Sequence, residues 1–422
     1  LMSKPEAYII GAGLSGLSAA VALTAAGYKT KVYESSVQAG GRCRSFWDDE
    51  IGAYIDNGNH LILGANKSVF AFLKVIGNEG GLIAQEKSLY PFIDIKSGKY
   101  WNIHLNKGKI PWWIFSPKRR VPDSTWVNYL TILRLAIASR KSTVKDCLGQ
   151  NSIMSERLWD PICKAVLNIE IESASARLLW PVIKLTFGSG AEGSKPYFTR
   201  EGLSKALIEP AIEFIEKNNG QIKYGHRLRE IIFSGKKAVS LNFGEHSIEI
   251  NKKNQVIVAV PPQIASQMLP GIKAPNETRA ILNAHYKLSQ RVKLPCESRI
   301  LGLVGGTADW IFVRNKILSV TVSAADQLID QNSDLLANKL WEDVSLALGL
   351  SKTKIPKYRI VKEKRATFAQ DPIAATISRH GAKTPWKNVT LAGDWTNTGL
   401  PATIEGAVRS GLTAAIRARK KM

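Results

Sequence analysis

A strand, a glycine-rich turn and a helix follow one another between residues 8 and 34, and this stretch constrains the fold more than any other. The run Tyr8-Ile9-Ile10 is apolar and β-prone, and the turn after it reads Gly-Ala-Gly-Leu-Ser-Gly. An alanine-rich segment, 17–26, predicts a helix, and a second β-prone run, 30–33, leads to Glu34. The stretch therefore predicts one βαβ unit with the G-x-G-x-x-G spacing of a dinucleotide-binding turn.

Each glycine of this turn has a physical role toward a dinucleotide: Gly11 permits the tight turn, Gly13 lets a pyrophosphate approach the backbone, and Gly16 lets the helix pack on the strand. The helix N-terminus offers free N–H groups to the phosphates. Glu34, 18 residues after Gly16, can accept hydrogen bonds from ribose hydroxyls. The alternative is a glycine-rich turn in an ordinary α/β domain. The cofactor-binding residues expected in this unit are Gly11, Gly13, Leu14, Ser15, Gly16 and Glu34.

Composition limits the class of protein. A chain of 422 residues with 45% hydrophobic residues can bury a large core and is expected to form two domains, which excludes disorder as its main state. The four cysteines are widely spaced, so we expect reduced thiols and no metal site. The start does not read as a signal peptide, and outside the βαβ unit no apolar run reaches the roughly 20 residues of a membrane-spanning helix.

The net charge of +23 favours an anionic partner, although plain solubility is an alternative. No nucleic-acid-binding motif accompanies this charge, so nucleic acid is not expected. Tryptophans gather between residues 90 and 200, and segment 110–120 sets Trp112, Trp113 and Phe115 beside three basic residues. Aromatic residues flanked by cations suit the headgroup level of a bilayer, which predicts docking on an anionic membrane surface. The alternative is that these aromatic residues belong to the core of a helical substrate domain.

A second glycine loop, Gly40-Gly41-Arg42, follows the βαβ unit. Adjacent glycines bring backbone close to a ligand, and the arginine can reach a phosphate or the edge of a flavin. The alternative is a surface turn with a solvated arginine. A polar turn, Asp-Asn-Gly-Asn-His, comes shortly after this loop at 56–60.

The C-terminal end carries a third motif. The apolar run 389–392 predicts a strand that leads into Gly393-Asp394, and the stretch 397–411 is expected to open the last helix. The N-terminus of such a helix can stabilise negative charge on a ligand. Strand-then-helix motifs at both ends of the chain therefore predict one composite nucleotide site.

Together these motifs resemble the large family of FAD-dependent amine oxidases and carotenoid-type desaturases. The resemblance implies FAD rather than NAD, because nicotinamide dehydrogenases do not usually carry a Gly-Gly-Arg loop after the ribose-binding acid. It places Arg42 beside the flavin and the pyrophosphate, the backbone near Leu228 at the adenine, and Asp394 at the ribityl or phosphate portion. The residues that the resemblance adds to the cofactor site are Gly41, Arg42, Leu228, Gly393, Asp394, Ala402, Thr403 and Ile404.

The resemblance also implies an α/β fold, in which a Rossmann-like FAD-binding domain of the amine oxidase type carries an inserted α+β substrate domain. Parts of the FAD-binding domain are expected at 1–89, 197–262 and 361–422. The substrate domain is expected at 90–196, as a helical and aromatic-rich part, and at 263–360, as a sheet plus a helix.

The wording of the motifs narrows the family. G-G-R-C-R-S-F, I-D-N-G-N-H, R-A-T-F-A and the C-terminal run 391–411 closely resemble the hydroxysqualene dehydroxylase family of bacterial hopanoid biosynthesis. That resemblance implies reduction of hydroxysqualene, a C30 isoprenoid, to squalene by reduced FAD, with an electron donor that the sequence does not identify. It implies a cytoplasmic protein held peripherally at the bacterial inner membrane. The chain departs from the expected Arg-Pro at Arg379-His380.

Two residues are candidates for the catalytic acid. Asp56 and His60 belong to the polar turn that follows the flavin-side loop, and their alternative is a structural role. Other activities also fit the fold, namely a phytoene- or squalene-type desaturase, an amine oxidase and a non-catalytic isoprenoid carrier. The amine oxidase is disfavoured because Thr403 stands where amine oxidases usually place a tyrosine.

Overall fold

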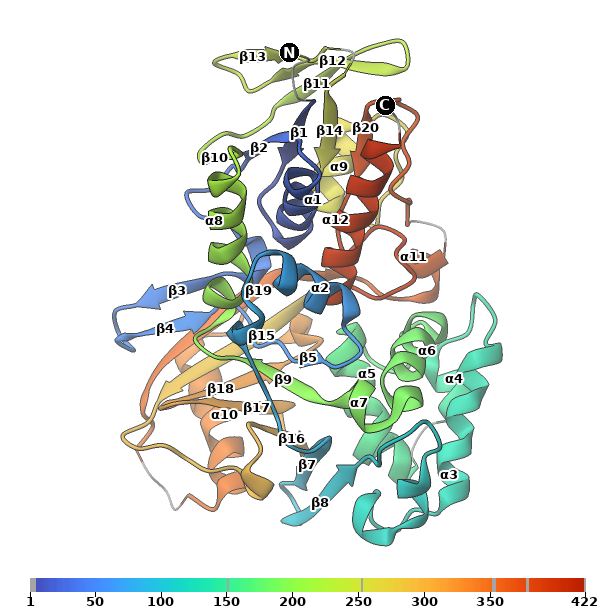
Figure 1. Cartoon of the computed structure of the whole chain (residues 1–422). Helices are drawn as coiled ribbons and strands as arrows, with labels where there is room; N and C mark the ends of the chain where they lie inside the picture. The colour runs from blue at the N-terminus through green and yellow to red at the C-terminus, as the bar shows by residue number, and fades with distance from the viewer. Residues whose placement is uncertain (1–4, 150–151, 252, 351–353, 377–378, 421–422) are drawn as a thin grey trace.

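The computed structural model describes residues 5–149, 152–251, 253–350, 354–376 and 379–420. Figure 1 shows an upper part built on a parallel sheet and a lower part in which a larger sheet lies beside a group of short helices. The first strand, β1 (Glu6–Ile10), and the last helix, α12 (Ile404–Arg419), both belong to the upper part. The two ends of the described chain therefore build the same part of the molecule.

Five parallel strands form the upper sheet in the order β10-β2-β1-β14-β20. The predicted βαβ unit is confirmed, because β1 and β2 pair in parallel with Ile9 opposite Val32, and α1 (Leu14–Ala25) connects them. On its other side β1 pairs with β14, where Ile9 lies opposite Ile257. The remaining strands of this sheet are β2 (Lys29–Tyr33), β10 (Gln221–Lys223), β14 (Gln255–Val258) and β20 (Val389–Leu391).

The two faces of the upper sheet pack against different layers, because successive side chains of a strand point to opposite faces. Ala7 and Ile9 join the core shared with α1, α8 (Glu209–Lys217) and α12. Tyr8 and Ile10 join a core that includes the antiparallel meander β11-β12-β13. The meander strands are β11 (Glu230–Ser234), β12 (Lys237–Asn242) and β13 (Ser247–Glu249).

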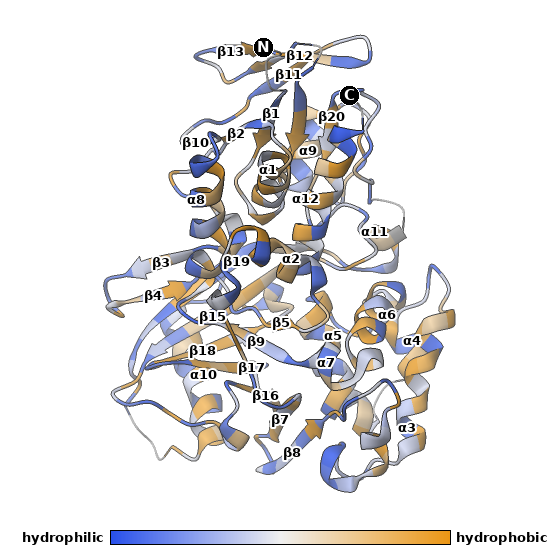
Figure 2. Cartoon of the chain, viewed as in Figure 1, coloured by the Kyte–Doolittle hydropathy of each residue, from blue (hydrophilic) through white to orange (hydrophobic). Residues whose placement is uncertain are grey.

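The lower sheet has seven strands in the order β19-β15-β18-β17-β16-β7-β8. At 263–360, where a sheet plus a helix was expected, the structure has β15 to β18, the first residues of β19 and the helix α10. Figure 2 colours β14, β17 and β18 mostly as hydrophobic, as expected for strands that are buried. The elements are β7 (Leu89–Asp94), β8 (Lys99–His104), β15 (Thr278–Lys287), β16 (Ile300–Val304), β17 (Trp310–Arg314), β18 (Ile317–Val322), β19 (Lys357–Phe368) and α10 (Ser333–Leu348).

The part expected to be helical, 90–196, needs a correction at its start, because residues 89–104 form β7 and β8. β7 is held by a strand about two hundred residues away, with Phe92 opposite Gly302 of β16. A Cβ at Gly302 would collide with the Phe92 ring, which stacks on Trp101 at 5.6 Å between centroids. The segment is therefore a hairpin, β7-β8, whose first strand also packs against a distant glycine.

The group of short helices covers the end of the lower sheet that holds β7 and β8. Trp113, Tyr129 and Trp159 share one core with Phe92 and Trp101 of the sheet. Among the described residues this group consists of α3 (Trp126–Leu130), α4 (Val144–Leu148), α5 (Asp160–Leu167), α6 (Ala176–Leu185) and α7 (Gly190–Ser194), with the 3₁₀ turns η3 (Trp112–Phe115) and η5 (Thr131–Ile137).

Short elements connect the two parts of the molecule. The hairpin β3-β4 and the small sheet β5-β9-β6 lie between the two large sheets (Figure 1). The predicted boundary at 360/361 falls inside β19, so that strand continues from the proposed substrate domain toward the FAD-binding domain. The connecting elements are β3 (Ser45–Asp48), β4 (Ala53–Asp56), β5 (Ile62–Leu63), β6 (Leu82–Ala84), β9 (Pro196–Thr199), α2 (Lys67–Val75), α9 (Pro262–Met268) and α11 (Pro372–Thr376).

Candidate cofactor-binding and active site

The first glycine turn has room for a ligand at one glycine only. At Gly11, where φ is +103°, an added Cβ would lie 2.5 Å from the carbonyl oxygen of Ala259, and at Gly16 it would overlap the Gly11 carbonyl oxygen. At Gly13 an added Cβ would meet no atom within 4 Å. Gly13 is also the N-cap of α1, and no side chain caps that helix. Gly11 and Gly16 therefore serve the packing of the turn, while the space in front of Gly13 and the helix N-terminus is open.

Glu34 lies beside this turn at the end of β2. Its carboxylate accepts hydrogen bonds from the amides of Ala12 at 2.8 Å and Ser36 at 2.9 Å. These bonds fix the carboxylate next to the open space at Gly13. The position agrees with the expected contact to a ribose.

Leu228 reaches the same region. Leu228 is buried in the segment directly before β11, which begins at Glu230. The amide of His226 donates to the carbonyl of Glu34 at 2.8 Å, and the amide of Arg229 donates to the carbonyl of Asn242 in β12 at 2.8 Å, so the segment links the end of β2 to the meander. The bond from His226 brings the backbone near Leu228 close to Glu34.

The second glycine loop packs directly against the first. The amide of Gly40 donates to the carbonyl of Ala12 at 2.8 Å, and Gly13 and Gly40 form an isolated parallel bridge. A Cβ at Gly41 would lie 3.6 Å from the Cα of Gly13. Two backbone segments that are separate in the sequence thus border one space.

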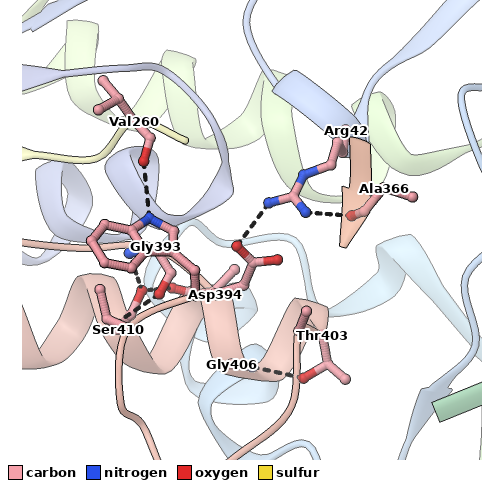
Figure 3. A network of polar contacts seen from close by, with 12 residues as sticks. Arg42, Val260, Ala366, Gly393, Asp394, Thr403, Gly406 and Ser410 are labelled. Atoms are coloured by element: carbon pink, nitrogen blue, oxygen red, sulfur yellow. Dashed lines mark hydrogen bonds and ion pairs between the residues drawn. The ribbon is translucent and has the colours of Figure 1, made fainter. Parts of the chain in front are cut away.

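Arg42 connects this loop to the C-terminal motif (Figure 3). Its guanidinium donates to a carboxylate oxygen of Asp394 at 2.7 Å and to the carbonyl of Ala366 at 2.5 Å. The neighbouring Asp394 carboxylate raises the pKa of Arg42 further above its usual range. The ion pair joins the second glycine loop to the C-terminal motif, and the bond from Gly40 to Ala12 joins that loop to the first turn.

The loop around Gly393 and Asp394 is braced from several sides. The amide of Gly393 donates to the Ser410 hydroxyl at 2.9 Å, and the Trp395 indole donates to the carbonyl of Val260 at 3.0 Å (Figure 3). The buried Arg379 donates to the carbonyls of Asp394, Trp395 and Thr396 and lies over the Phe368 ring. Burial lowers the pKa of Arg379 to about 10. The chain therefore uses Arg379, in the stretch where it departs from the family wording, to hold the loop that presents Asp394.

The last helix begins at Ile404, inside the stretch 397–411 that was expected to open it. Thr403 is its N-cap, and its hydroxyl accepts a hydrogen bond from the amide of Gly406 at 3.0 Å (Figure 3). The amide of Ala402 donates to the side chain of Gln370 at 2.8 Å. The Thr403 hydroxyl and the side-chain amide of Gln370, just after β19, thus fix the turn that was expected to face the flavin.

Glu405, in the first turn of α12, is a buried carboxylate that the sequence analysis missed. Its oxygens accept hydrogen bonds from the amides of Ser68 and Val69, both at 3.1 Å, at the start of α2. Arg409 donates to it from one turn later at 3.2 Å. A carboxylate at a helix N-terminus compensates the free amides and the positive end of the helix dipole, so Glu405 joins α2 to the cofactor side of the molecule.

Asp56 has contacts that support the structural alternative. One carboxylate oxygen accepts from the Ser45 hydroxyl at 2.6 Å and the Leu203 amide at 2.9 Å, and the other pairs with Arg314 at 2.6 Å. Its oxygens therefore bind the hairpin β3-β4 to β17. His60 lies nearby, and burial lowers its pKa to about 4, partly offset by Asp56.

A polar network behind the 56–60 turn was not predicted. Asn59 donates to the Thr321 hydroxyl at 2.9 Å, which donates in turn to the amide oxygen of Asn283 at 2.9 Å. A signal was present in the sequence, since Asn283 and His285 interrupt the otherwise apolar run of β15. His60 and His285 line one small cavity together with the side chains of Asp56, Asn59, Phe198, Thr199, Leu203, Arg299, Phe312, Val313, Arg314, Ile317 and Ser319.

The geometry fits a dinucleotide cofactor with its phosphates at the first turn. The open space at Gly13, the uncapped N-terminus of α1 and the Glu34 carboxylate border one region, and Gly41, next to Arg42, lies beside Gly13. Within the described ranges, no group of three or more His, Cys, Asp or Glu side chains is placed to hold a metal ion. None of the helices that the structure describes is long and apolar enough to cross a bilayer.

Comparison with known proteins decides the family. The sequence profile of the "flavin containing amine oxidoreductase" family matches residues 14–418. A hydroxysqualene dehydroxylase of Rhodopseudomonas palustris is 40% identical over 415 residues, 98% of each chain. One of Sinorhizobium fredii is 41% identical over 408 residues, 97% of each chain. The chain belongs to the hydroxysqualene dehydroxylase family.

Members of the wider superfamily are more distant. A 15-cis-phytoene desaturase from an Oncidium hybrid is 24% identical over 451 residues, which gives the desaturase alternative only weak support. The solved structure of cyclohexylamine oxidase from Brevibacterium oxydans covers 99% of both chains at 17% identity and a TM-score of 0.72, which shows the fold. The predicted α/β FAD-binding fold is thus confirmed. The protein is an FAD-dependent oxidoreductase of the hydroxysqualene dehydroxylase family.

Proposed function

We propose that this protein replaces the hydroxyl group of hydroxysqualene with hydrogen to give squalene. The observation that carries the proposal is the likeness to named hydroxysqualene dehydroxylases at about 40% identity over nearly the whole chain. Arg42 of the G-G-R motif and Asp394 of the C-terminal motif, two of the motifs behind that resemblance, form an ion pair, which supports the proposal. The desaturase reading is the alternative, because the same fold hosts it.

The balance of the reaction defines what the chain must do. The C–O bond breaks, one hydride and one proton are taken up, and the oxygen leaves as water. Bound FAD, once reduced by a donor, supplies the hydride. The chain's own tasks are to hold the cofactor, to orient the hydrocarbon and to keep bulk water away from the carbon that loses its hydroxyl.

We assign the first task to residues at the glycine turns and at α12. The amides of Leu14, Ser15 and Gly16 at the start of α1 would receive the phosphates, and Glu34 would receive the ribose. Arg42 and Asp394 would hold the central part of the cofactor. The N-terminus of α12, with Ala402, Thr403 and Ile404, would place its positive end at the flavin pyrimidine edge.

The test of this function uses the holoenzyme under anaerobic conditions. The flavin is reduced chemically, hydroxysqualene is added, and lipid products are identified by mass spectrometry while flavin absorbance is followed. Squalene should form in step with flavin oxidation, with one deuterium incorporated when the hydride is labelled; the run is repeated with the isotopes of flavin and solvent reversed. Formation of a conjugated polyene from squalene by the oxidised enzyme would assign the protein to the desaturases instead.

We also propose that the enzyme docks on an anionic membrane through the surface of η3, α3 and η5. Trp112 and Phe115 are 62% and 50% exposed, and Phe115 lies 5.9 Å from the exposed Trp126, ring centroid to ring centroid. Trp113 is instead buried in the core. Of the three aromatic residues in this segment, Trp112 and Phe115 are therefore free for membrane docking, whereas Trp113 belongs to the core. The other exposed apolar residues of this surface are Ile110, Val127, Leu130, Leu133 and Ile137.

Basic residues surround this surface, notably Lys118, Arg119 and Arg120 directly after η3. Each basic residue near an anionic bilayer contributes about 1 kcal/mol of attraction. A protein that has to take up a C30 hydrocarbon gains from contact with the membrane in which such a lipid dissolves.

Vesicle co-sedimentation tests the docking. Replacing Trp112 and Phe115 by serine should weaken binding to anionic vesicles at least about threefold, because two exposed anchors are lost. The matched control replaces Trp47 and Tyr54, an exposed aromatic pair on the β3-β4 hairpin at 5.3 Å, and should leave binding unchanged. Equal binding of all three proteins, or binding that ignores salt and lipid charge, would contradict the proposal.

A further inference from the structure

Four basic side chains border one cavity on the lower sheet. The cavity has a volume of about 470 Å³, and its lining includes Lys287 at the end of β15, Arg291 shortly after it, and Arg314 and Lys316 at the turn between β17 and β18. Pockets for small molecules occupy roughly 300–1,000 Å³, so the volume suits such a ligand. None of the lining residues belongs to the glycine turns or to α12, so this cavity is separate from the proposed cofactor site.

The positive charge around this cavity is not neutralised by the chain itself. Of the four basic side chains, only Arg314 has a carboxylate within ion-pair distance in the described part of the chain, namely Asp56 at 2.6 Å. On β19, Lys357 lies directly opposite Lys287, and like charges opposite one another on antiparallel strands destabilise their pairing. Glu201 is the single carboxylate in the lining. The cavity therefore keeps an excess of positive charge that an anionic ligand would neutralise.

Backbone contacts fix the walls that carry these charges. The amide of Leu288, one residue after Lys287, donates to the carbonyl of Lys316 at 2.8 Å, which holds the end of β15 against the β17-β18 turn. Besides its ion pair, the guanidinium of Arg314 donates to the carbonyl of Tyr54 at 3.3 Å, which joins the turn to the β3-β4 hairpin. With a net charge of +23 many cations of this chain have no partner, but here they converge on one hollow with fixed walls. Pre-positioned groups lose less freedom when a ligand binds.

An exposed aromatic ring belongs to the same lining. Tyr54 of β4 is 59% exposed, and its ring lies 5.3 Å from that of Trp47, centroid to centroid. An exposed aromatic side chain can stack on a nucleobase. The carboxylate of Glu201 can accept hydrogen bonds from ribose hydroxyls, whereas it would repel a bare phosphate. The lining thus offers cations for phosphates, a carboxylate for a sugar and a ring for a base.

We infer that this cavity is a second ligand site and that it binds a soluble nucleotide. Lys287, Arg291 and Lys316 receive the phosphates, and Tyr54 packs against the base. A phosphate could also come from a lipid headgroup, but the β3-β4 hairpin and α3 lie at opposite sides of the molecule in Figure 1. The site is therefore not part of the proposed membrane-docking surface, and its ligand comes from solution.

Calorimetric titration of the FAD-saturated holoenzyme with ADP tests this site, because bound FAD keeps the probe out of the cofactor site. ADP should bind at one site per chain. Replacing Arg291 and Lys316 together by serine should weaken ADP binding at least roughly tenfold, because two charge-assisted contacts are lost. Tyr54→Ser should weaken ADP binding at least about threefold and leave inorganic pyrophosphate binding unchanged, because only ADP carries a base. Flavin absorbance verifies that each variant is an intact holoenzyme.

A matched control separates this site from the general positive charge of the chain. Replacing Lys118 and Arg119 by serine removes the same charge beside η3 and should leave ADP binding unchanged. Absence of saturable ADP binding to the wild-type holoenzyme, equal weakening by both double replacements, or pyrophosphate binding as tight as that of ADP would overturn the inference.

Vesicle binding distinguishes the two sources of phosphate. The Arg291 and Lys316 double variant should bind anionic vesicles like the wild type. Loss of vesicle binding in this variant with unchanged ADP binding would assign these charges to a lipid headgroup and overturn the inference. The ADP titration contains no isoprenoid, so its outcome does not depend on the proposed reaction.

Discussion

The guanidinium of Arg42 donates to the carboxylate of Asp394 at 2.7 Å across 352 positions of sequence (Figure 3). The pair joins the second glycine loop to the motif that opens the last helix. Because Asp394 is buried and Gly41, next to Arg42, lies beside Gly13, the pair sets the distance between the two halves of the cofactor site. Replacing either residue should therefore weaken cofactor binding more than it lowers the stability of the fold.

Loss of this pair is predicted to weaken FAD binding. Asp394→Asn keeps the shape but removes the charge, and Arg42→Gln removes the partner; each should raise the dissociation constant of FAD roughly tenfold or more. The double variant should lose less FAD-binding free energy than the two single variants lose together, because the residues act as a unit. Titration of deflavinated protein with FAD measures all four constants; strictly additive losses would show that the two residues do not act as a unit, and unchanged constants would show that the pair does not act on the cofactor.

Two glycines of the first turn should separate cofactor binding from folding. Gly13→Ala adds a methyl group to open space at an extended backbone position, so stability should change by about 1 kcal/mol or less while FAD affinity falls at least roughly tenfold. Gly16→Ala forces a methyl group into the Gly11 carbonyl, so it should destabilise the fold by about 1–3 kcal/mol. Thermal unfolding with and without FAD distinguishes the two variants. Equal stability and equal stabilisation by FAD in both variants would refute the assignment of Gly13 to the phosphates.

The parts of the fold that sequence predicts are those fixed by local chemistry. The turn at Gly11 needs a positive φ, and the helix after it needs a glycine at Gly16, so both can be recognised without the rest of the chain. The start of α12 at Ile404 has a similar local signal in Thr403. The cofactor residues at these turns could thus be named from the sequence, although their binding roles remain predictions.

Other features depend on partners far away in the chain. β7 forms a local hairpin with β8, but its parallel pairing with β16, where Phe92 lies opposite Gly302, is not indicated by any residue near Phe92. Trp112 and Trp113 are adjacent, yet only the packing of η3 decides that the second one is buried. The pairing of Asp56 with Arg314 likewise becomes visible only once β17 lies against the β3-β4 hairpin.

The carboxylate of Glu405 is predicted to stabilise the start of α2. Glu405→Ala removes the acceptor for the Ser68 and Val69 amides and should destabilise the protein by about 1–2 kcal/mol, in the upper range for a helix cap. Arg409→Ala removes only its half-exposed ion-pair partner and should cost about 0.5 kcal/mol or less. Calorimetry on both variants measures the difference, and a larger loss for Arg409→Ala would show that the ion pair, not the cap, matters.

The buried imidazole of His285 predicts a pH dependence of stability that its own replacement should remove. Burial lowers the pKa of His285 to about 4, whereas an unfolded histidine titrates near 6.5. Between these values the unfolded chain binds a proton that the folded chain does not, so this group's contribution is fully present above about pH 6.5 and is lost as pH falls toward 4. The shift corresponds to roughly 3 kcal/mol of folding free energy.

Comparing wild type with His285→Gln tests this, because the neighbouring charged groups Asp56, Arg314 and His60 are present in both proteins and their effects cancel to first order. The difference in melting temperature between the two should move against wild type as pH falls from 7 to about 4.5 and should level off below that. A difference that stays constant over this range would mean that His285 keeps an ordinary pKa, and hence that its ring is hydrated in the folded protein.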